Sequence, residues 1–507
     1  TLDNWYGLDV TAASISVDSD SGISVSGNGY LGGNQGGNGL SGRTTGNQAG
    51  STGGAGGSYG GYGGVTGAGL ANAIYGDPAD PVEPGSGGST AEGSFLAGNG
   101  GGLLRIKAAT ITLYGSILAE GGDTDYDGSS GGGSGGGIRI DAGSLAGNGE
   151  ISAYGSYGRV IGGSGGRVAI YYDTLNLPVG NIYAAGNWGD EIIAPYDGGA
   201  GTIYLKNNAL ARADLIVDND GTDTLEGSSL LRTVGQGTIG IITGDSLTMA
   251  GGNWKPGEFK GTRINPNVKQ QRSFAIRDNT ADTLFIDPAE GNLNEVAAVG
   301  DTFIGVVELN SLRVSGRAGL TVTGPLNVTT DVVVDNATLI AADISANNLA
   351  VTNNGKVSHP PATTTADYRL TVNSANSVNV DNSSSIDVSG RGYLGGNQPG
   401  NDRNGRTLGN ISGSSGGSGG SYGGKGGTTG SGAANSVYGD PVNPNEAGSG
   451  GGSVDDSAIS GSGGGLIRIN THSIQLDGRI QADGGSGNCG GSGGGIRIET
   501  DNLDGNG

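Results

Sequence analysis

The chain has 507 residues, of which 26 are basic and 48 acidic, and its formal net charge of −22 disfavours nucleic acid and anionic membranes as partners. Glycine supplies 111 residues and proline only 14, which argues against a collagen-like chain. The 34% apolar content is low for one large globular core but suits stacked repeats with a thin core. The single cysteine, Cys489, excludes an intrachain disulfide, and no apolar run is long enough for membrane insertion.

The first residues predict short β-strands. The runs WYGLDV, SISV and GISVSG, within residues 5–27, place apolar side chains between Asp, Ser and Gly at strand-like intervals. No helical periodicity of useful length occurs in the chain, because Gly, Asn, Asp, Thr and Val dominate it and all are poor helix formers. We therefore expect an all-β protein.

A long glycine-rich segment occurs twice. Residues Ser24–Ile106 return at Asp387–Ile469, and equivalent residues such as Tyr30 and Tyr393 lie 363 positions apart throughout. A loop-rich segment is expected to keep this constant offset, without insertions or deletions, only if its structure requires a fixed length. We therefore expect both copies to form the same module.

Within this segment the sequence adopts a period of three. Residues 53–64 read GGAGGSYGGYGG, and residues 415–427 read SGGSGGSYGGKGG. An X-Gly-Gly period suits an extended threefold helix of the polyglycine II kind, in which glycine lets neighbouring backbones approach closely. The alternative is a mobile glycine loop. In the ordered interpretation, the segment is held by six tyrosines, which are Tyr30, Tyr59, Tyr75, Tyr393, Tyr422 and Tyr438.

After the glycine-rich segment, short phrases recur at nearly constant intervals. The phrases GGGLLRI, SGGGIRI, SGGRVAI and GAGTIYL align on Leu104, Ile138, Val168 and Ile203, with spacings of 34, 30 and 35. Second strands lie between these phrases, so each period holds two strands and a glycine-rich loop. This pattern predicts a right-handed parallel β-helix, a solenoid with glycine-rich side loops.

The chain is expected to divide into three parts. Residues 1–205 form the first module, with its glycine-rich loop at about residues 31–100, and residues 364–507 form the start of a second, incomplete module. Residues 206–363 are poor in glycine. Within them, residues 253–300 concentrate Lys, Arg and aromatics and have no second copy, which fits either an inserted β subdomain or a kink.

These phrases carry a resemblance to known proteins. The phrases SGGGIRI, SGGRVAIYY and LDGRIQADGG, and the duplicated YLGGNQ…YGDP segment, resemble the glycine-rich repeat regions of very large secreted surface proteins of bacteria and archaea. Their broader type is similar to the parallel β-helices of adhesins and filamentous-haemagglutinin-like proteins. The resemblance implies an extracellular, cell-surface location and an adhesive or scaffold-forming role, and no functional residue carries over. The start lacks a signal-like segment, so a secreted chain would be present here in mature or excerpted form.

One acidic loop has the residue types of a calcium site. Asp123, Asp125 and Asp127 precede Gly128, and carboxylates at alternate positions can converge on one Ca²⁺. The second copy replaces this loop with GSGNCGG, which favours a solvated acidic turn instead. A second cluster, made of Asp218, Asp220 and Asp223, has the same two interpretations. We expect no required cofactor, with Ca²⁺ as the one candidate ion.

Catalytic chemistry has weak support in the sequence. Polysaccharide lyases and hydrolases often use a parallel β-helix, and the triplet Arg105-Ile106-Lys107 is similar to a short basic motif of the hydrolases. No paired Asp residues accompany the triplet, and the second copy reads Arg468-Ile469-Asn470, so an outward-facing strand position is the better interpretation. The two histidines, His359 and His472, have no nucleophile beside them in the sequence. We therefore predict no catalytic or cofactor-binding residue.

The function expected from the sequence is structural. We expect a non-enzymatic extracellular fibre, filament or adhesin stalk on a microbial cell surface, built from tandem 363-residue modules that associate end to end or laterally. The alternative is a protein that binds or degrades a surface polysaccharide, and a third, weaker one is an ice- or mineral-binding face. Four sequons, at Asn327, Asn336, Asn382 and Asn410, leave glycosylation open.

Overall fold

The computed structural model describes residues 4–124, 130–158, 161–187, 197–429 and 431–507. The chain is 38% strand and 4% helix, and the helical residues form short 3-10 turns, so the prediction of an all-β protein is confirmed. The chain divides into two compact units, Thr1–Thr323 and Gly324–Gly507, each with its own dense set of contacts. Among the described residues, no helix is long and apolar enough to cross a membrane.

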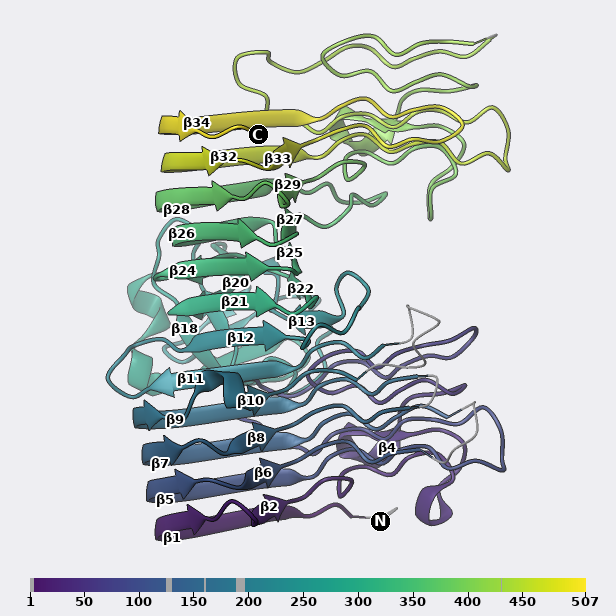
Figure 1. Ribbon diagram of the computed structural model, residues 1–507. Coiled ribbons are helices and arrows are strands. Elements are labelled where there is room, and N and C mark those ends of the chain that lie inside the picture. Colours follow the sequence, from purple (N-terminus) through teal and green to yellow (C-terminus); the bar gives the residue numbers. More distant parts are fainter. Residues whose placement is uncertain (1–3, 125–129, 159–160, 188–196, 430) are drawn as a thin grey trace. The chain divides into compact units, whose positions relative to one another are not determined.

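The long strands at the start of unit 1 form a parallel ladder (Figure 1). They are β1 (Gly7–Val17), β5 (Leu103–Leu113), β7 (Gly137–Gly147), β9 (Arg167–Asn176) and β11 (Thr202–Asn207). Leu104 lies opposite Ile138, Ile138 opposite Val168, and Val168 opposite Ile203. These four side chains are buried, because alternate residues of a strand face the same side and stack into one apolar column.

A second parallel ladder lies across this core from the first. It contains β2 (Gly22–Ser24), β6 (Ser116–Leu118), β8 (Glu150–Ser152) and β10 (Ile182–Tyr183). Ile117 and Ile151 of these strands are fully buried and belong to the same apolar cluster as Leu104 and Ile138. The core is therefore thin, with few side chains contributed by each strand.

The prediction of a right-handed parallel β-helix, however, is wrong. In the described part of the chain the main sheet is mixed and has 20 strands, with both parallel and antiparallel pairs. The first reversal follows β11: the amide of Leu210 donates to the carbonyl of Asn207 (3.0 Å), and β12 (Asp214–Asp218) returns antiparallel to β11. Apolar residues alternate in the same way in parallel and in antiparallel strands, so the sequence pattern could not predict that the chain reverses after β11.

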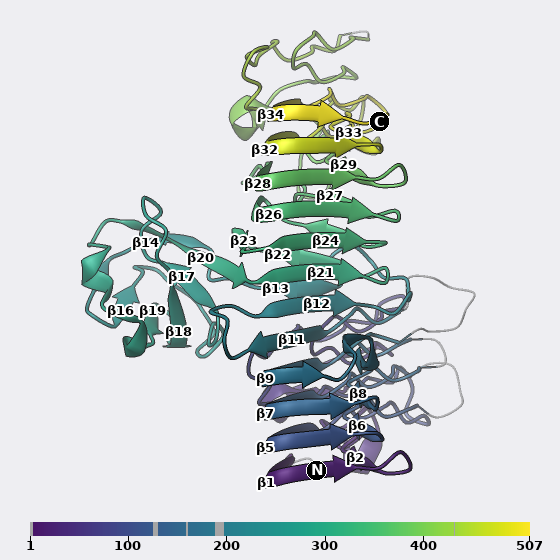
Figure 2. The ribbon, with the colours of Figure 1, turned by 60° about the vertical axis from the view of Figure 1, so that its left-hand side comes forward.

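An antiparallel insertion follows the reversal and projects beside β12 (Figure 2). Its strands are β14 (Gln236–Thr238), β15 (Ile241–Ile242), β16 (Ser246–Thr248), β17 (Arg263–Asn265), β18 (Phe274–Asn279), β19 (Thr283–Ile286) and β20 (Thr302–Leu309). Each pairs antiparallel with its neighbours. Phe259, Phe274 and Phe303 are buried in a separate apolar cluster, so the insertion has a core of its own. The glycine-poor residues 253–300 lie within it.

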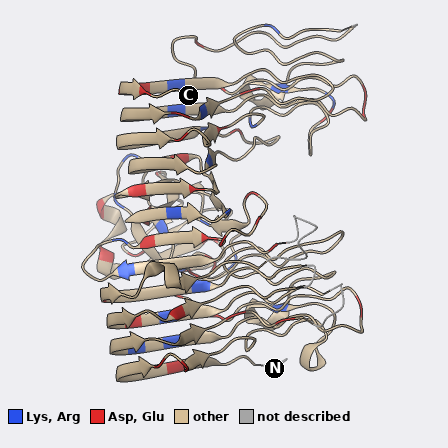
Figure 3. Ribbon diagram, in the orientation of Figure 1, with Lys and Arg blue, Asp and Glu red and all other residues tan. Residues whose placement is uncertain are grey.

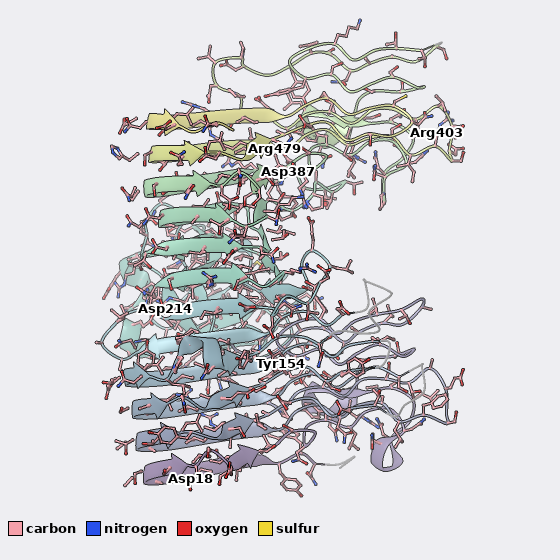
Figure 4. All side chains as sticks on the ribbon, viewed as in Figure 1. Asp18, Tyr154, Asp214, Asp387, Arg403 and Arg479 are labelled. Atoms are coloured by element: carbon pink, nitrogen blue, oxygen red, sulfur yellow. The ribbon has the colours of Figure 1, made fainter. Side chains whose placement is uncertain are left out.

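After the insertion the chain resumes parallel pairing. Strand β21 (Ser311–Ser315) runs parallel to β12, and β13 (Ser229–Leu231) parallel to β22 (Gly319–Val322). Asp214, labelled in Figure 4, accepts hydrogen bonds from Asn310 Nδ2 (2.7 Å) and Ser311 Oγ (2.5 Å). These bonds connect the residues that follow β20, the last strand of the insertion, to β12, which precedes the insertion in the chain.

Unit 2 repeats the two-ladder arrangement. The long strands are β23 (Leu326–Val328), β24 (Asp331–Asp335), β26 (Asp343–Thr352), β28 (Leu370–Val380), β32 (Leu466–Leu476) and β34 (Gly495–Asp504). The short strands are β25 (Thr338–Ile340), β27 (Lys356–Ser358), β29 (Ser385–Asp387) and β33 (Arg479–Gln481). Neighbouring strands within each ladder are parallel, for example β26 with β28 and β32 with β34.

Short elements complete both copies of the glycine-rich segment. In the first copy they are η1 (Gln35–Gly37), β3 (Arg43–Thr44), η2 (Thr45–Asn47) and β4 (Gln48–Ala49). In the second copy they are β30 (Arg406–Thr407), η6 (Leu408–Asn410) and β31 (Ile411–Ser412). The remaining 3-10 turns are η3 (Val179–Asn181), η4 (Pro288–Glu290) and η5 (Leu293–Glu295).

Candidate functional site: the glycine bundle

The glycine-rich segments of unit 1 pack against one another as extended chains beside the strands (Figure 1). We call this packed set the glycine bundle. It comprises residues 29–33, 54–64, 85–90, 97–102, 119–122, 131–137, 153–156, 161–166, 184–187 and 198–201. Most of its residues are buried although few belong to a strand. The bundle is thus a packed element without ordinary secondary structure.

The hydrogen bonds of residues 131–136 show how the bundle is held. The amides of Gly131, Gly132 and Gly133 donate to Ser89, Ile161 and Gly122, at 2.8, 2.9 and 3.4 Å. The amides of the next three residues donate to the same three segments in the same order: Ser134 to Ser86, Gly135 to Ser164 and Gly136 to Ala119, at 2.9, 2.8 and 2.6 Å. The donors therefore turn through three directions with a period of three residues, as in an extended threefold helix.

Three further segments donate to the carbonyls of this central segment. The amides of Gly98, Gly57 and Ser156 donate to Gly131, Gly132 and Gly133, at 3.1, 2.9 and 2.8 Å. One extended segment is thus hydrogen-bonded to six others. A strand in an ordinary sheet has only two hydrogen-bonded neighbours, so the bundle links its backbones in more directions than a sheet does.

Glycine is required here by the close approach of the backbones. A Cβ added to Gly133 would lie 1.7 Å from the carbonyl oxygen of Asn99, and one added to Gly136 would lie 2.0 Å from that of Gly102. Atoms cannot approach so closely, so a side chain at either position would force the segments apart. The high glycine content of the chain is explained by this packing rather than by flexibility.

A buried asparagine joins the first part of the bundle. Asn72 Nδ2 lies within 3.2 Å of Thr44 Oγ1, Ser86 Oγ and the carbonyl oxygen of Ser58, while Asn72 Oδ1 accepts from Ser51 Oγ (2.9 Å) and the Ser58 amide (3.0 Å). All five residues are buried. Such a buried polar network is stable only when its members are satisfied, so it defines one arrangement of the loop.

The tyrosines singled out in the sequence lie beside this network. Tyr30 and Tyr59 are buried, and the Tyr59 and Tyr75 rings are 4.7 Å apart. Tyr75 Oη donates to the carbonyl of Pro84 (2.6 Å). Burial raises the pKa of Tyr59 and of Tyr75, so both stay neutral in the fold.

A buried arginine covers these rings. The Arg167 guanidinium lies 5.4 Å from the centre of the Tyr59 ring and donates to the carbonyl of Tyr75 through Nε (3.0 Å) and Nη2 (2.8 Å). It also donates to Thr202 Oγ1 (3.1 Å). Burial lowers the pKa of Arg167, and the neighbouring Asp77 acts in the opposite direction. Arg167 therefore fixes the strand β9 to the glycine-rich loop.

The second copy rebuilds the same contacts. Asn435 Nδ2 contacts Thr407 Oγ1 (3.0 Å) and Ser449 Oγ (3.1 Å), and its Oδ1 accepts from Ser414 Oγ (2.9 Å). Tyr438 Oη donates to the carbonyl of Ala447 (2.6 Å). Each of these residues lies 363 positions after its counterpart in the first copy.

The duplicated packing extends past a deletion. The second copy is five residues shorter between Gly122 and Gly131, yet the amide of Ser492, the counterpart of Ser134, donates to Ser449 (2.9 Å), as Ser134 does to Ser86. The contact between these two segments is therefore kept despite the length change, although the amide of Cys489, at the position of Gly131, donates to Ser460 Oγ (3.3 Å) instead. This network could have been predicted from the sequence, because Asn72, Ser51 and Thr44 each recur 363 positions later. Neither Asn72 nor Arg167, however, was identified from the sequence as a structural residue.

Charged side chains lie mainly outside the bundle. In Figure 3 the glycine segments beside β5, β7 and β9 are almost entirely without charge, whereas the strands and turns carry Lys, Arg, Asp and Glu. The outward-facing Arg105 and Arg139, for example, both pair with Asp80, at 3.3 and 2.7 Å. Arg105 of the candidate basic triplet thus forms an ion pair on the outer face of the strand.

The remaining candidate residues do not converge on one site. Asp123 accepts a hydrogen bond from Ser156 Oγ (3.2 Å), while Asp125 and Asp127 lie outside the described residues, so the calcium site stays a prediction. Among the residues that are described, no group of three His, Cys, Asp or Glu side chains could hold a metal ion.

The second acidic cluster is divided among separate partners. Asp218 accepts from Ser315 Oγ (2.6 Å), Asp220 from Tyr154 Oη (2.5 Å), and Asp223 pairs with Arg317 (2.7 Å). Tyr154, labelled in Figure 4, follows β8 at the edge of the glycine bundle. These carboxylates connect neighbouring loops of unit 1.

The two histidines lie in different environments. His359 is fully buried, and its Nδ1 contacts the carbonyl of Pro360 (2.7 Å), whereas His472 is exposed and pairs with Asp501 (2.8 Å). Cys489 is a free, partly exposed thiol. No nucleophile and base among the described residues form a pair at these positions.

The fold and the bundle define a class: an all-β protein whose duplicated glycine segments are tightly packed. No family model, no curated protein and no solved structure matches the chain.

Proposed function

We propose that this is a non-enzymatic structural protein of a microbial cell surface, which forms or decorates an extracellular fibre or adhesin stalk from tandem 363-residue modules. The observation that carries the proposal is the duplicated glycine-rich packing, in which one segment of the first copy, residues 131–136, is hydrogen-bonded to six others. Such cross-linking by backbone hydrogen bonds distributes force over many weak bonds without needing disulfides.

The chemistry of the bundle also supports a mechanical role. Its interior contains backbone, Ser hydroxyls, one asparagine network and buried tyrosine rings, and among the described residues no group of three His, Cys, Asp or Glu side chains could hold a metal ion. The same contacts form in two copies that differ in their surroundings, since Asn72 and Asn435 make equivalent bonds. A repeated module with fixed internal geometry is what a fibre or stalk needs.

Electron microscopy of the purified full chain tests the proposal. We expect fibres or rods of uniform width, and we expect Gly133→Ala to abolish them, because the new Cβ would lie 1.7 Å from a carbonyl oxygen. The matched control is Gly39→Ala, whose Cβ meets nothing within 4 Å among the described residues. Compact particles that degrade an acidic polysaccharide in a Ca²⁺-dependent way would instead establish the polysaccharide alternative.

A further inference from the structure

Two tyrosine rings stack on neighbouring strands of the short ladder in unit 1. Tyr183 belongs to β10, and Tyr154 follows β8, the strand that pairs with β10. The two ring centres lie 5.3 Å apart, and the ring planes differ by 21°. Both residues are half-buried, so neither ring is sealed from solvent. The pair therefore lies within reach of a small reagent.

The Tyr154 phenol has a proton acceptor in contact with it. Its Oη donates to Asp220 Oδ2 at 2.5 Å, the short distance of a charge-assisted hydrogen bond. Burial and this hydrogen bond raise the pKa of Tyr154, so the phenol keeps its proton at neutral pH. An electron leaves such a phenol more easily when the proton moves to a positioned base in the same step. Asp220 is placed to act as that base.

The loop that carries Asp220 is fixed by its own hydrogen bonds. The neighbouring Asn219 is fully buried, its Oδ1 accepts from the amide of Gly186 (2.9 Å), and its Nδ2 donates to the carbonyl of Gly198 (3.2 Å). The Asp220 amide donates to Asp218 Oδ1 (2.7 Å). The carboxylate is therefore held beside the phenol before any reaction begins.

The other tyrosine pairs lack such an acceptor. Among the described residues, three further pairs have ring centres 4.7, 6.0 and 5.0 Å apart, and they are Tyr59 with Tyr75, Tyr171 with Tyr204, and Tyr422 with Tyr438. Tyr75, Tyr171 and Tyr438 donate to backbone carbonyls instead. A carboxylate can take the phenol proton, whereas a peptide carbonyl is not a titratable group. The Tyr154–Tyr183 pair therefore differs in chemistry from the others.

We propose that Tyr154 and Tyr183 are a site of covalent modification: a one-electron oxidant joins their rings into a dityrosine cross-link, and Asp220 accepts the Tyr154 proton. Each phenol loses one electron and one proton, and the Tyr183 proton passes to water. A carbon–carbon bond then forms between the two ring carbons next to the phenol oxygens, favoured by the stacked arrangement, and the hydrogen on each of these carbons moves to its oxygen. With hydrogen peroxide and a haem peroxidase as the oxidant, the two electrons and two protons convert one peroxide into two water molecules.

The product is a covalent link between β8 and β10. The single cysteine of the chain excludes an intrachain disulfide, so this link supplies a cross-link of a different chemistry. It forms within one chain and does not depend on whether the protein forms fibres.

Oxidation of the full chain at low concentration tests the proposal. The oxidant is photogenerated tris(bipyridine)ruthenium(III), which diffuses freely and removes one electron at a time. Trypsin cleaves after Arg167, between the two tyrosines, so mass spectrometry of the digest distinguishes linked from unlinked peptides. We expect a peptide that joins Tyr154 to Tyr183 and is lighter than its two parts by two hydrogen atoms. Its yield should not change when the protein is diluted, because the link is intrachain.

Substitution of the carboxylate isolates its role as proton acceptor. Asp220→Asn keeps an oxygen that accepts the Tyr154 hydrogen bond but cannot take the proton, so the chain should fold normally and the cross-link should form about tenfold or more slowly. The matched control is Asp223→Asn in the same loop, because Asp223 pairs with Arg317 rather than with a phenol. Its rate should equal that of the original chain. Tyr183→Phe should abolish the linked peptide.

Three other outcomes would overturn the proposal. The first is the absence of the linked peptide under conditions that oxidise Tyr114, which is 54% exposed and reports that the oxidant is active. The second is an equal rate of cross-linking in the Asp220→Asn, Asp223→Asn and original chains. The third is a linked peptide whose yield falls on dilution, which would show that the tyrosines join different chains.

Discussion

At the scale of single residues, His359 couples the stability of unit 2 to pH. Burial is the main cause that lowers the pKa of His359 from 6.5 to about 4, and the Arg391 cation acts in the same direction. As pH falls below 6.5 the unfolded chain binds this proton first, so stability is lost between pH 6.5 and about 4. The full loss is about 3 kcal/mol, at about 1.4 kcal/mol per pKa unit.

Calorimetry of the full chain at about pH 7 and about pH 5 measures this loss. We expect His359→Gln to show a smaller fall in the midpoint of thermal unfolding than the original chain, because it removes the proton-binding site. His472→Gln is the matched control, since His472 is exposed, and its fall should equal that of the original chain. Equal falls in all three proteins would rule out His359 as the sensitive group.

Asn72 holds several segments of the first copy of the glycine-rich loop together through its buried side-chain hydrogen bonds. Asn72→Ala would remove the side-chain partners of the buried Ser58 amide and Ser58 carbonyl and one partner each of Thr44 Oγ1 and Ser86 Oγ. Each such group costs about 1–3 kcal/mol, so we expect a loss of about 3 kcal/mol or more in the free energy of unfolding. Chemical denaturation checks this value.

The second copy supplies the control for this prediction. Asn435→Ala should cause a loss of similar size, because Asn435 makes the equivalent bonds. The exposed Asn382→Ala should change the free energy of unfolding by less than about 0.5 kcal/mol. If Asn72→Ala behaves like Asn382→Ala, the network is not what orders the loop.

At the scale of elements, one substitution should act oppositely in the two copies. Gly60→Ala places a Cβ 2.3 Å from a carbonyl oxygen, and we expect it to cost about 3 kcal/mol or more. Gly423→Ala, at the equivalent position, meets nothing within 4 Å among the residues that the structure describes, and we expect no loss and a gain of up to about 1 kcal/mol from the restricted unfolded chain. Thermal unfolding of both variants tests the pair, and similar losses would mean that close packing is not what requires glycine.

The glycine bundle should also protect its amides from solvent exchange. Residues 131–136 belong to no long strand, yet five of their six amides donate hydrogen bonds of 2.9 Å or less inside the bundle. We expect them to exchange as slowly as those of β7, and those of Gly423 and Gly427 to exchange rapidly. Hydrogen exchange measured by mass spectrometry distinguishes this result from fast exchange throughout, which a mobile glycine loop would give.

Strands were predictable from the sequence because their side chains alternate. The alignment of Leu104, Ile138, Val168 and Ile203 by phrase alone matches the register in the sheet. The direction of each strand was not predictable, since alternation is the same for parallel and antiparallel pairs. The turn after β11 and the antiparallel insertion therefore contradict the prediction of a parallel β-helix.

The candidate site was only partly visible in the sequence. The fixed offset between copies indicated that the glycine-rich segments hold a defined length, but the partners of each amide depend on contacts between segments far apart in the chain. Arg167 donates to Tyr75, for example, across 92 positions. A short-range pattern cannot show such a contact, whereas the recurrence of Asn72 at Asn435 could have indicated the polar network.

At the scale of the whole molecule, charge sets the conditions for lateral association. The net charge of −22 is carried mainly by strands and turns, as Figure 3 shows for unit 1, and the isoelectric point is near 4.3. Copies of one chain therefore repel each other at neutral pH, and the repulsion is screened by salt over about 10 Å at 0.1 M. Contact between chains then depends on ionic conditions.

We expect association of the full chain to increase as pH falls toward 4.3, and also as salt is raised at neutral pH, because both changes weaken the same repulsion. Light scattering at matched protein concentrations measures it, and near-UV circular dichroism verifies that the chain remains folded. Association that rises with acid but not with salt would point to unfolding, for which His359→Gln is the control. Association that responds to neither change would show that lateral contact is made through uncharged surfaces such as the glycine bundle.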